Sequence, residues 1–243
     1  MVVERARGDR RERADRILDT ARELLLSWGY RRVTIDELAR RAGVGKGTIY
    51  LHWRSREEVF HAVSAREAAA MADAIVDAVR NDPAEVALHR YLRRLFVEAM
   101  NRPVLRALYT RDADTLGTFL AAAHHHRLEE SKLGVNRDYL GVLAAEAMLR
   151  PDLHLIDLDY TLPTIVFGFF AAEPFHPPSI TLTLEQKADQ LADTVRRAFE
   201  PTDAPTGEAV KRAAAKALPI LERLVRDHRA ATYGGEQDDW AGN

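Results

Sequence analysis

The residues best suited to recognise another molecule form a short cluster near the N-terminus. The outward positions of this segment are Gly45, Lys46, Gly47, Thr48, Tyr50 and His52. The two glycines allow a close approach of the backbone, the lysine supplies positive charge, and the Thr, Tyr and His side chains supply hydrogen bonds. A segment of so little bulk fits the DNA major groove, which is about 12 Å wide. These residue types therefore predict contacts to double-stranded DNA.

The elements around this cluster have the spacing of a helix–turn–helix. Thr34 and Glu37 form a predicted capping box, which starts a helix that continues to about Arg41. Gly43 allows the positive φ angle that the tight turn requires, and a second short helix spans residues 45–51. We expect the angle between the two helices to be fixed by a small apolar core of Ile35, Leu38, Ala39, Val44 and Ile49.

Amphipathic helices are predicted on both sides of this motif. Before it, one apolar stripe runs along a four-turn helix through Ala14, Ile17, Leu18, Ala21, Leu24, Leu25 and Trp28. After it, Ser55 and Glu58 form a second capping box and start a long helix to about Asn81. Trp53 is expected to pack the small domain against that long helix.

The motif as a whole resembles a known family. The pattern Thr34-x-x-x-Leu38-Ala39-x-x-Ala42-Gly43-Val44-x-Lys46-Gly47-Thr48-Ile49-Tyr50-x-His52-Trp53-x-Ser55-Arg56 is similar to that of the TetR family of bacterial transcriptional regulators. The resemblance covers about residues 10–60. Two positions depart from the usual family pattern: Trp53 stands where Phe is usual, and Arg56 stands where Lys is usual. Both changes keep the chemistry, a buried aromatic ring and a cation.

The resemblance implies roles for the matching residues. Thr34, at a helix N-terminus, would contact a phosphate through its hydroxyl and nearby amides. The recognition helix would place Lys46, Gly47 and Thr48 against bases or adjacent phosphates. Phosphate contacts are implied for Tyr50, His52 and Arg56.

The distribution of charge agrees with a DNA-facing N-terminal part. Residues 1–60 carry a formal charge of +4, whereas the remainder carries −6, although the whole chain carries only −2. We expect residues 1–11 to form a basic tail, in which Arg5, Arg7, Arg10 and Arg11 could reach along the duplex. The DNA-binding domain is predicted over residues 12–58.

Composition excludes several other classes of protein. The chain has 243 residues, 47% of them apolar, which suffices for a sizeable core. The absence of cysteine excludes disulfides, thiolate metal sites and cysteine nucleophiles. With no apolar run of about 18 residues and no signal peptide, we expect a cytoplasmic protein that is not bound to membranes.

The rest of the chain also has helical periodicity, which predicts an all-α fold. We expect a helical ligand-binding and dimerisation domain over residues 59–232 and a loose tail over residues 233–243. Helices are predicted over residues 82–101, from Pro103, and over 114–127, 137–149, 160–172, 184–199 and 208–230.

The resemblance further implies a homodimer that binds a palindromic operator and releases it when a small-molecule inducer binds, most often as a repressor. The candidate dimer helices are residues 160–172 and 184–199, and the final helix is one of the alternatives. The inducer pocket would lie inside the C-terminal domain. Its candidate wall residues are Phe96, Met100, Leu105, Phe119, Leu120, Tyr139 and Phe167.

Two other functions compete with this interpretation. The triplet His124–His126 could suggest a metal-dependent hydrolase, but three consecutive helical residues spread over roughly 200° and cannot converge on one ion. The chain also lacks a phosphate loop, a G-x-S-x-G elbow and H-E-x-x-H. A non-specific architectural DNA binder is disfavoured by the modest local charge of +4. We therefore predict a regulator that is not an enzyme and has no cofactor or metal.

Overall fold

The regular structure of the described residues is entirely helical, as the sequence predicts. The computed structural model describes residues 2–110, 112–116, 126–172 and 181–233, together with Pro177 and Ser179; within these ranges the side chains of residues 2–7, 113, 114 and 126–133 are not described. Among the described helices, none combines the length and the apolar character needed to span a lipid bilayer.

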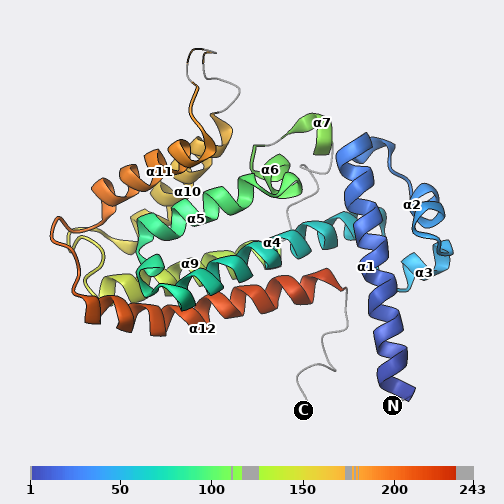
Figure 1. Ribbon diagram of the computed structural model, residues 1–243, viewed down its shortest axis with the longest axis horizontal. Coiled ribbons are helices and arrows are strands. Elements are labelled where there is room, and N and C mark those ends of the chain that lie inside the picture. Colours follow the sequence, from blue (N-terminus) through green and yellow to red (C-terminus); the bar gives the residue numbers. More distant parts are fainter. Residues whose placement is uncertain are drawn as a thin grey trace.

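The first helices form a separate group at one end of the molecule (Figure 1). This group, called the head here, comprises α1 (Val2–Trp28), a short 3₁₀ turn (Tyr30–Arg32), α2 (Ile35–Ala42) and α3 (Lys46–Tyr50). The long helix α4 (Arg56–Asn81) begins in the head and runs into the larger helical body. The core of the head includes the fully buried side chains of Ile17, Leu18, Leu25, Ile49, Val59 and Phe60.

The structure corrects the prediction for the first residues. Residues predicted as a tail belong to α1, which begins at Val2. Apolar periodicity begins only at Ala14, so the charged residues before it have no pattern that predicts a helix. Arg10 is placed by this helix, and its guanidinium donates a hydrogen bond of 3.4 Å to the carbonyl oxygen of Leu51, at the end of α3.

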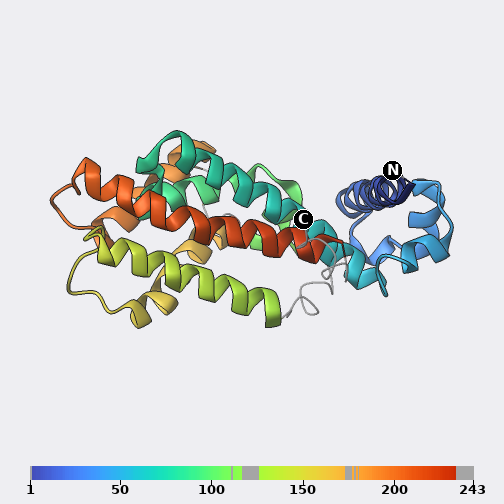
Figure 2. The same cartoon turned by 90° about the horizontal axis from the view of Figure 1, so that it is seen from below.

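The body contains the remaining helices. They are a 3₁₀ turn η2 (Pro83–Val86), α5 (Leu88–Met100), α6 (Pro103–Thr110), α7 (Ala113–Leu116), α9 (His126–Ala145), α10 (Leu155–Ala171), α11 (Leu184–Phe199) and α12 (Gly207–Thr232). The last helix packs along α4 and α9, and α11 packs on α5. Figure 2 shows α12 running between α4 and α9, which explains why its Ala213, Ala217 and Leu221 are buried.

Three predicted helices have different limits. Residues 82–101 do not form one helix, because the Asp82 carboxylate caps the amide of Ala84 and Ala87 is extended between η2 and α5. Among the described residues, α9 begins eleven residues before the predicted start and ends at Ala145, since Ala147 has a φ angle of 54°. The third helix, α10, begins at Leu155, five residues before the predicted start at residue 160, and continues through Pro163.

Candidate nucleic-acid interface and ligand cavity

The turn between α2 and α3 has the geometry that the sequence predicts. Gly43 adopts φ 66° and ψ 35°, the left-handed conformation that side chains disfavour. The amide of Val44 donates to the carbonyl oxygen of Ala39 at 3.0 Å, which closes the end of α2. Gly45 then precedes α3 in an extended conformation. This turn fixes the direction in which α3 leaves α2.

The short helix α3 has one buried and one exposed side. Ile49 is fully buried in the core of the head, whereas Lys46, Gly47 and Tyr50 are exposed and Thr48 is half-buried. Tyr50 exposes 52% of its surface, so it is not a core residue. A Cβ atom added at Gly47 would meet nothing within 4 Å. The residues predicted to face DNA are therefore brought together on one open surface.

Lys46 has a partner that the sequence analysis missed. Its ammonium group forms an ion pair with the carboxylate of Asp36, in the first turn of α2. Both side chains are more than half exposed, so water and salt weaken this pair. Sequence spacing gave no signal for it, because the two residues lie on different helices. A DNA phosphate would compete with Asp36 for the same cation.

Thr34 caps α2, but the predicted capping box is incomplete. The Thr34 hydroxyl accepts a hydrogen bond from the amide of Glu37 at 3.2 Å. The Glu37 carboxylate does not return the contact and instead accepts hydrogen bonds from Arg40 and Arg41. These bonds, from Arg40 first and then Arg41, lower the pKa of Glu37 to about 2. Glu37 binds these arginines instead of the Thr34 amide because both lie about one helical turn away on the same face of α2.

Arg56 and His52 lie at the edge of this surface and have contacts within the protein. The Arg56 guanidinium donates to the carbonyl oxygen of Val33 at 3.1 Å and lies 4.3 Å from the ring centroid of Tyr30. The ring of His52 lies 5.2 Å from that of Trp53. Both residues are half-buried, so each has a structural role in addition to the phosphate contact implied by the resemblance.

A cavity of about 570 Å³ lies in the body, between α5, α6, α9 and α10. This volume is typical of small-molecule sites, which span roughly 300–1,000 Å³. Its described lining is mostly apolar and aromatic: Leu88, Tyr91, Leu92, Leu95, Leu108, Tyr109, Asn136, Tyr139, Leu140, Leu158, Asp159, Leu162, Pro163, Val166, Phe167 and Phe170.

The structure places the predicted wall residues differently. Tyr139 and Phe167 line the cavity. The described lining does not include Phe96, Met100 or Leu105; Phe96 is fully buried, and its ring lies 4.8 Å from that of Phe170. The remaining two candidates, Phe119 and Leu120, lie outside the described residues. Sequence reasoning missed Tyr91 and Tyr109, because periodicity does not separate a core-facing aromatic residue from a cavity-facing one.

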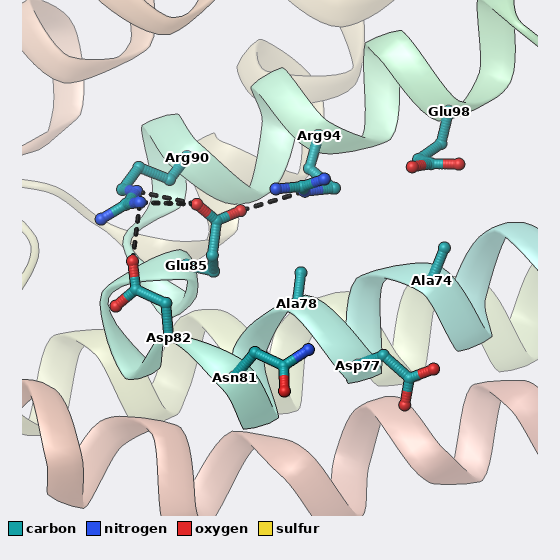
Figure 3. A pocket seen from close by; sticks show the side chains of 9 residues that line it. All are labelled: Ala74, Asp77, Ala78, Asn81, Asp82, Glu85, Arg90, Arg94 and Glu98. Atoms are coloured by element: carbon teal, nitrogen blue, oxygen red, sulfur yellow. Dashed lines mark hydrogen bonds and ion pairs between the residues drawn. The ribbon is translucent and has the colours of Figure 1, made fainter.

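A second hollow of about 500 Å³ between α4, η2 and α5 is polar (Figure 3). Glu85 accepts a hydrogen bond from Arg90 at 3.0 Å and one from Arg94 at 3.1 Å, and Asp82 accepts one from Arg90 at 2.8 Å. Two further acidic residues at its edge, Asp77 and Glu98, pair with neighbouring arginines. Each of the four carboxylates in the lining is therefore paired with an arginine, two of them with Arg80 and Arg102 beside the hollow, and the packing of the helices explains this hollow.

The structure does not test the histidine triplet as a metal site. His124 and His125 lie outside the described residues, and the side chain of His126 is not described. Within the described part of the chain, no group of three or more His, Cys, Asp or Glu residues is placed to hold a metal ion.

Comparison with known proteins agrees with this geometry. Residues 17–63 match the family model for bacterial regulatory proteins of the tetR family. The chain is 24% identical to the HTH-type transcriptional regulator SrpR of Pseudomonas putida over 215 residues, which cover 78% of this chain and 98% of SrpR. It is 36% identical to the HTH-type transcriptional activator FasR of Mycolicibacterium smegmatis over 90 residues, 37% of this chain and 39% of FasR.

A solved structure extends the likeness of the fold over most of the chain. The structure of NalD, the secondary repressor of the MexAB-OprM multidrug efflux pump in Pseudomonas aeruginosa, superposes with a TM-score of 0.57 at 16% identity. The match covers 81% of this chain and all of NalD. With the helix–turn–helix geometry, these findings show that residues 17–63 carry the DNA-binding domain of the tetR family of bacterial regulatory proteins, and they support a DNA-binding transcriptional regulator of that family.

Proposed function

We propose that this protein is a transcriptional repressor whose homodimer binds a palindromic operator and releases it when a small molecule occupies the cavity. The observation that carries the proposal is the open face of α3, where Lys46, Gly47 and Tyr50 are exposed opposite the buried Ile49. A rigid short helix with this arrangement suits insertion into a major groove.

The proposed contacts to DNA follow from the positions of the side chains. Lys46, Gly47 and Thr48 would face base edges or adjacent phosphates. Thr34, Tyr50, His52 and Arg56 would contact phosphates around the groove, and Gly45 would let the backbone at the start of α3 approach closely. Such phosphate contacts set the register of the protein, whereas the base contacts select the sequence.

The dimer interface is proposed on α10 and α11. Ile156 and Tyr160, one turn apart on α10, expose 74% and 78% of their surface. Exposed large apolar residues at this helical spacing favour a partner surface. The apolar face of α11 packs on α5, which leaves its Gln190, Asp193 and Thr194 exposed. A two-fold axis here would place the two heads in successive major grooves, ~34–36 Å apart or somewhat more.

Coupling between the cavity and the head is proposed to pass through α6. Val104 and Ala107 of α6 pack in the core of the head. The next two residues of the same helix, Leu108 and Tyr109, line the cavity. A ligand that displaces α6 would therefore move the head. Release follows only if the ligand binds the displaced arrangement more tightly, and DNA must then weaken ligand binding by the same factor.

The experiment is a selection of bound duplexes from a random pool with the purified protein, repeated with Lys46→Ala and Tyr50→Ala. Lys211→Ala is the matched control, because Lys211 is an exposed lysine at the start of α12, in the body. We expect a palindromic consensus with the wild type and the control, lost in the other two variants. No enrichment with folded dimer would contradict sequence-specific binding and favour an architectural role.

The sign of regulation needs its own measurement, because SrpR is named only as a regulator, FasR as an activator and NalD as a repressor. A reporter gene placed behind the selected operator would give it. We expect expression to fall when the protein is supplied; a rise would contradict repression and leave operator binding intact.

A further inference from the structure

The cavity in the body has a lining with little charge. Among the described lining residues there is no lysine, arginine or histidine, and the one charged residue is Asp159. Its carboxylate is already paired with Arg137, whose guanidinium lies 2.6 Å away and is mostly exposed. A carboxylate ligand would therefore enter a largely apolar space without a cation in the described lining, and an unpaired buried charge is costly.

Two tyrosines in this lining differ in what their hydroxyl groups do. The hydroxyl of Tyr139 donates to the carbonyl oxygen of Val86 at 2.6 Å and is fully engaged. The neighbouring Tyr91, whose ring lies 4.8 Å from that of Tyr139, has no hydrogen-bond partner for its hydroxyl among the described residues. Only 7% of the surface of Tyr91 is exposed. The hydroxyl of Tyr91 is not among the described buried atoms that lack a partner, so it meets open space, and the cavity that Tyr91 lines is where it could gain a partner.

The state of this hydroxyl decides what it can bind. Burial, helped by the nearby Tyr109, raises the pKa of Tyr91 well above its ordinary value. The phenol therefore stays protonated at neutral pH and offers a hydrogen to an acceptor atom. Around it, Tyr109, Phe167 and Phe170 provide aromatic surface for an apolar molecule.

We propose that the cavity binds a neutral, largely apolar or aromatic molecule whose carbonyl or similar oxygen accepts the hydrogen bond of Tyr91, and that it discriminates against carboxylates. The inference rests on the proposed function only for its regulatory meaning. Binding itself is a property of the free protein and can be measured without DNA.

Three naphthalene probes of similar size test the assignment by titration calorimetry on the full chain. Methyl 2-naphthoate is neutral and carries an acceptor, 2-naphthoate carries the same ring with a negative charge, and 2-methylnaphthalene has no acceptor. We expect the ester to bind at least about tenfold more tightly than the anion. Equal affinity for ester and anion, or no binding of the ester up to about millimolar concentration, where even weak ligands bind, would overturn the proposal.

Two variants locate the hydrogen bond. Tyr91→Phe keeps the ring and removes the hydroxyl, so the ester should bind about threefold to tenfold more weakly, whereas 2-methylnaphthalene should be unaffected. Tyr139→Phe is the matched control, because the Tyr139 hydroxyl already donates to Val86. Its loss should leave the ratio of the affinities for the ester and for 2-methylnaphthalene unchanged. An unchanged ester affinity in folded Tyr91→Phe contradicts the role of Tyr91.

The outcome is distinguishable from a failure of the proposed function. If the ester binds as expected but does not release the operator, the site is confirmed and the regulatory proposal is not. If the protein binds an operator but no neutral probe, the proposed ligand class is wrong, whereas the proposed binding to DNA is unaffected.

Discussion

The indole N–H of Trp53 donates a hydrogen bond to the carbonyl oxygen of Thr232, 3.2 Å away and 179 residues later in the sequence. Trp53 is 2% exposed and follows α3, whereas Thr232 is the last residue of α12. Nearby, the hydroxyl of Tyr233 donates to Asp15 of α1 at 2.9 Å. Because α12 also packs along α4 and α9, these contacts join the head to the body at a point separate from α6.

Trp53→Phe should destabilise the protein. The change removes a buried donor, leaves the carbonyl oxygen of Thr232 without it, and shortens a fully packed side chain, so we expect a loss of about 1–3 kcal/mol in the free energy of unfolding. Urea denaturation measures it. Trp28→Phe, at a tryptophan that is 36% exposed, should lower the free energy of unfolding clearly less than Trp53→Phe does. Equal losses in the two variants would show that the buried contact to α12 contributes nothing.

Asp36→Asn should tighten binding to DNA. The change frees Lys46 from its ion pair and removes a negative charge that would face phosphate, so we expect about threefold to tenfold higher affinity at low salt. Asp77→Asn is the control, because Asp77 is equally exposed on α4 and pairs with Arg80. Fluorescence anisotropy with a labelled operator gives both dissociation constants. Weaker binding by Asp36→Asn would mean that the ion pair positions Lys46 rather than competing for it.

Gly47→Ala separates DNA binding from folding. The added methyl group meets nothing within 4 Å in the free protein, and alanine favours a helix by about 0.5–1 kcal/mol over glycine. The thermal midpoint should therefore stay the same or rise, while operator affinity falls at least about tenfold if the backbone of α3 approaches the DNA closely. Unchanged affinity would place DNA away from this face of α3.

The stability conferred by Glu37 should depend on pH. Its pKa in the folded protein is about 2, below the ordinary value of 4.5, because it accepts hydrogen bonds from Arg40 and Arg41. A lowered pKa stabilises the fold above the ordinary value, and this contribution is lost as the pH falls toward the folded value. The stability difference between wild type and Glu37→Gln should therefore narrow between about pH 5 and about pH 3. A difference that is constant over this range would contradict the arrangement.

Charged substitutions on the outer side of α10 should weaken the proposed dimer. Asp at Ile156 and Tyr160 places two carboxylates where the partner helix would pack, and we expect monomers in sedimentation velocity at micromolar concentration. Leu51→Asp is the control, because Leu51 is 73% exposed in the head. A dimer that survives Ile156→Asp and Tyr160→Asp together would move the interface elsewhere, with the exposed side of α12 as the next candidate.

The local features of the site could be predicted because they depend on neighbours in sequence. The turn at Gly43, the buried Ile49 and the exposed Lys46 and Tyr50 follow from spacing within one short motif. The pair between Lys46 and Asp36 could not be predicted, since it depends on how two helices cross. The capping-box pattern pairs Glu37 with Thr34, but Arg40 and Arg41, one turn along the same helix, compete for its carboxylate and bind it.

The cavity was harder to predict for a similar reason. Phe96 and Tyr91 lie on the same helix with similar apolar surroundings, yet one fills the core and the other lines the cavity. Which of them faces open space depends on where α9 and α10 pack. Ile156 lies before the predicted helix over residues 160–172, so periodicity could not place it beside Tyr160; the structure exposes both on successive turns of α10.

Sequence-specific recognition by α3 can be measured as a ratio of two dissociation constants. The two ligands are the selected palindromic duplex and a scrambled duplex of the same composition, at one salt concentration. We expect the scrambled duplex to bind about 10³-fold or more weakly to the wild type, and this ratio to fall toward one in the double variant Lys46→Ala with Tyr50→Ala. A ratio near one for the wild-type protein, with folded dimer present, would contradict it.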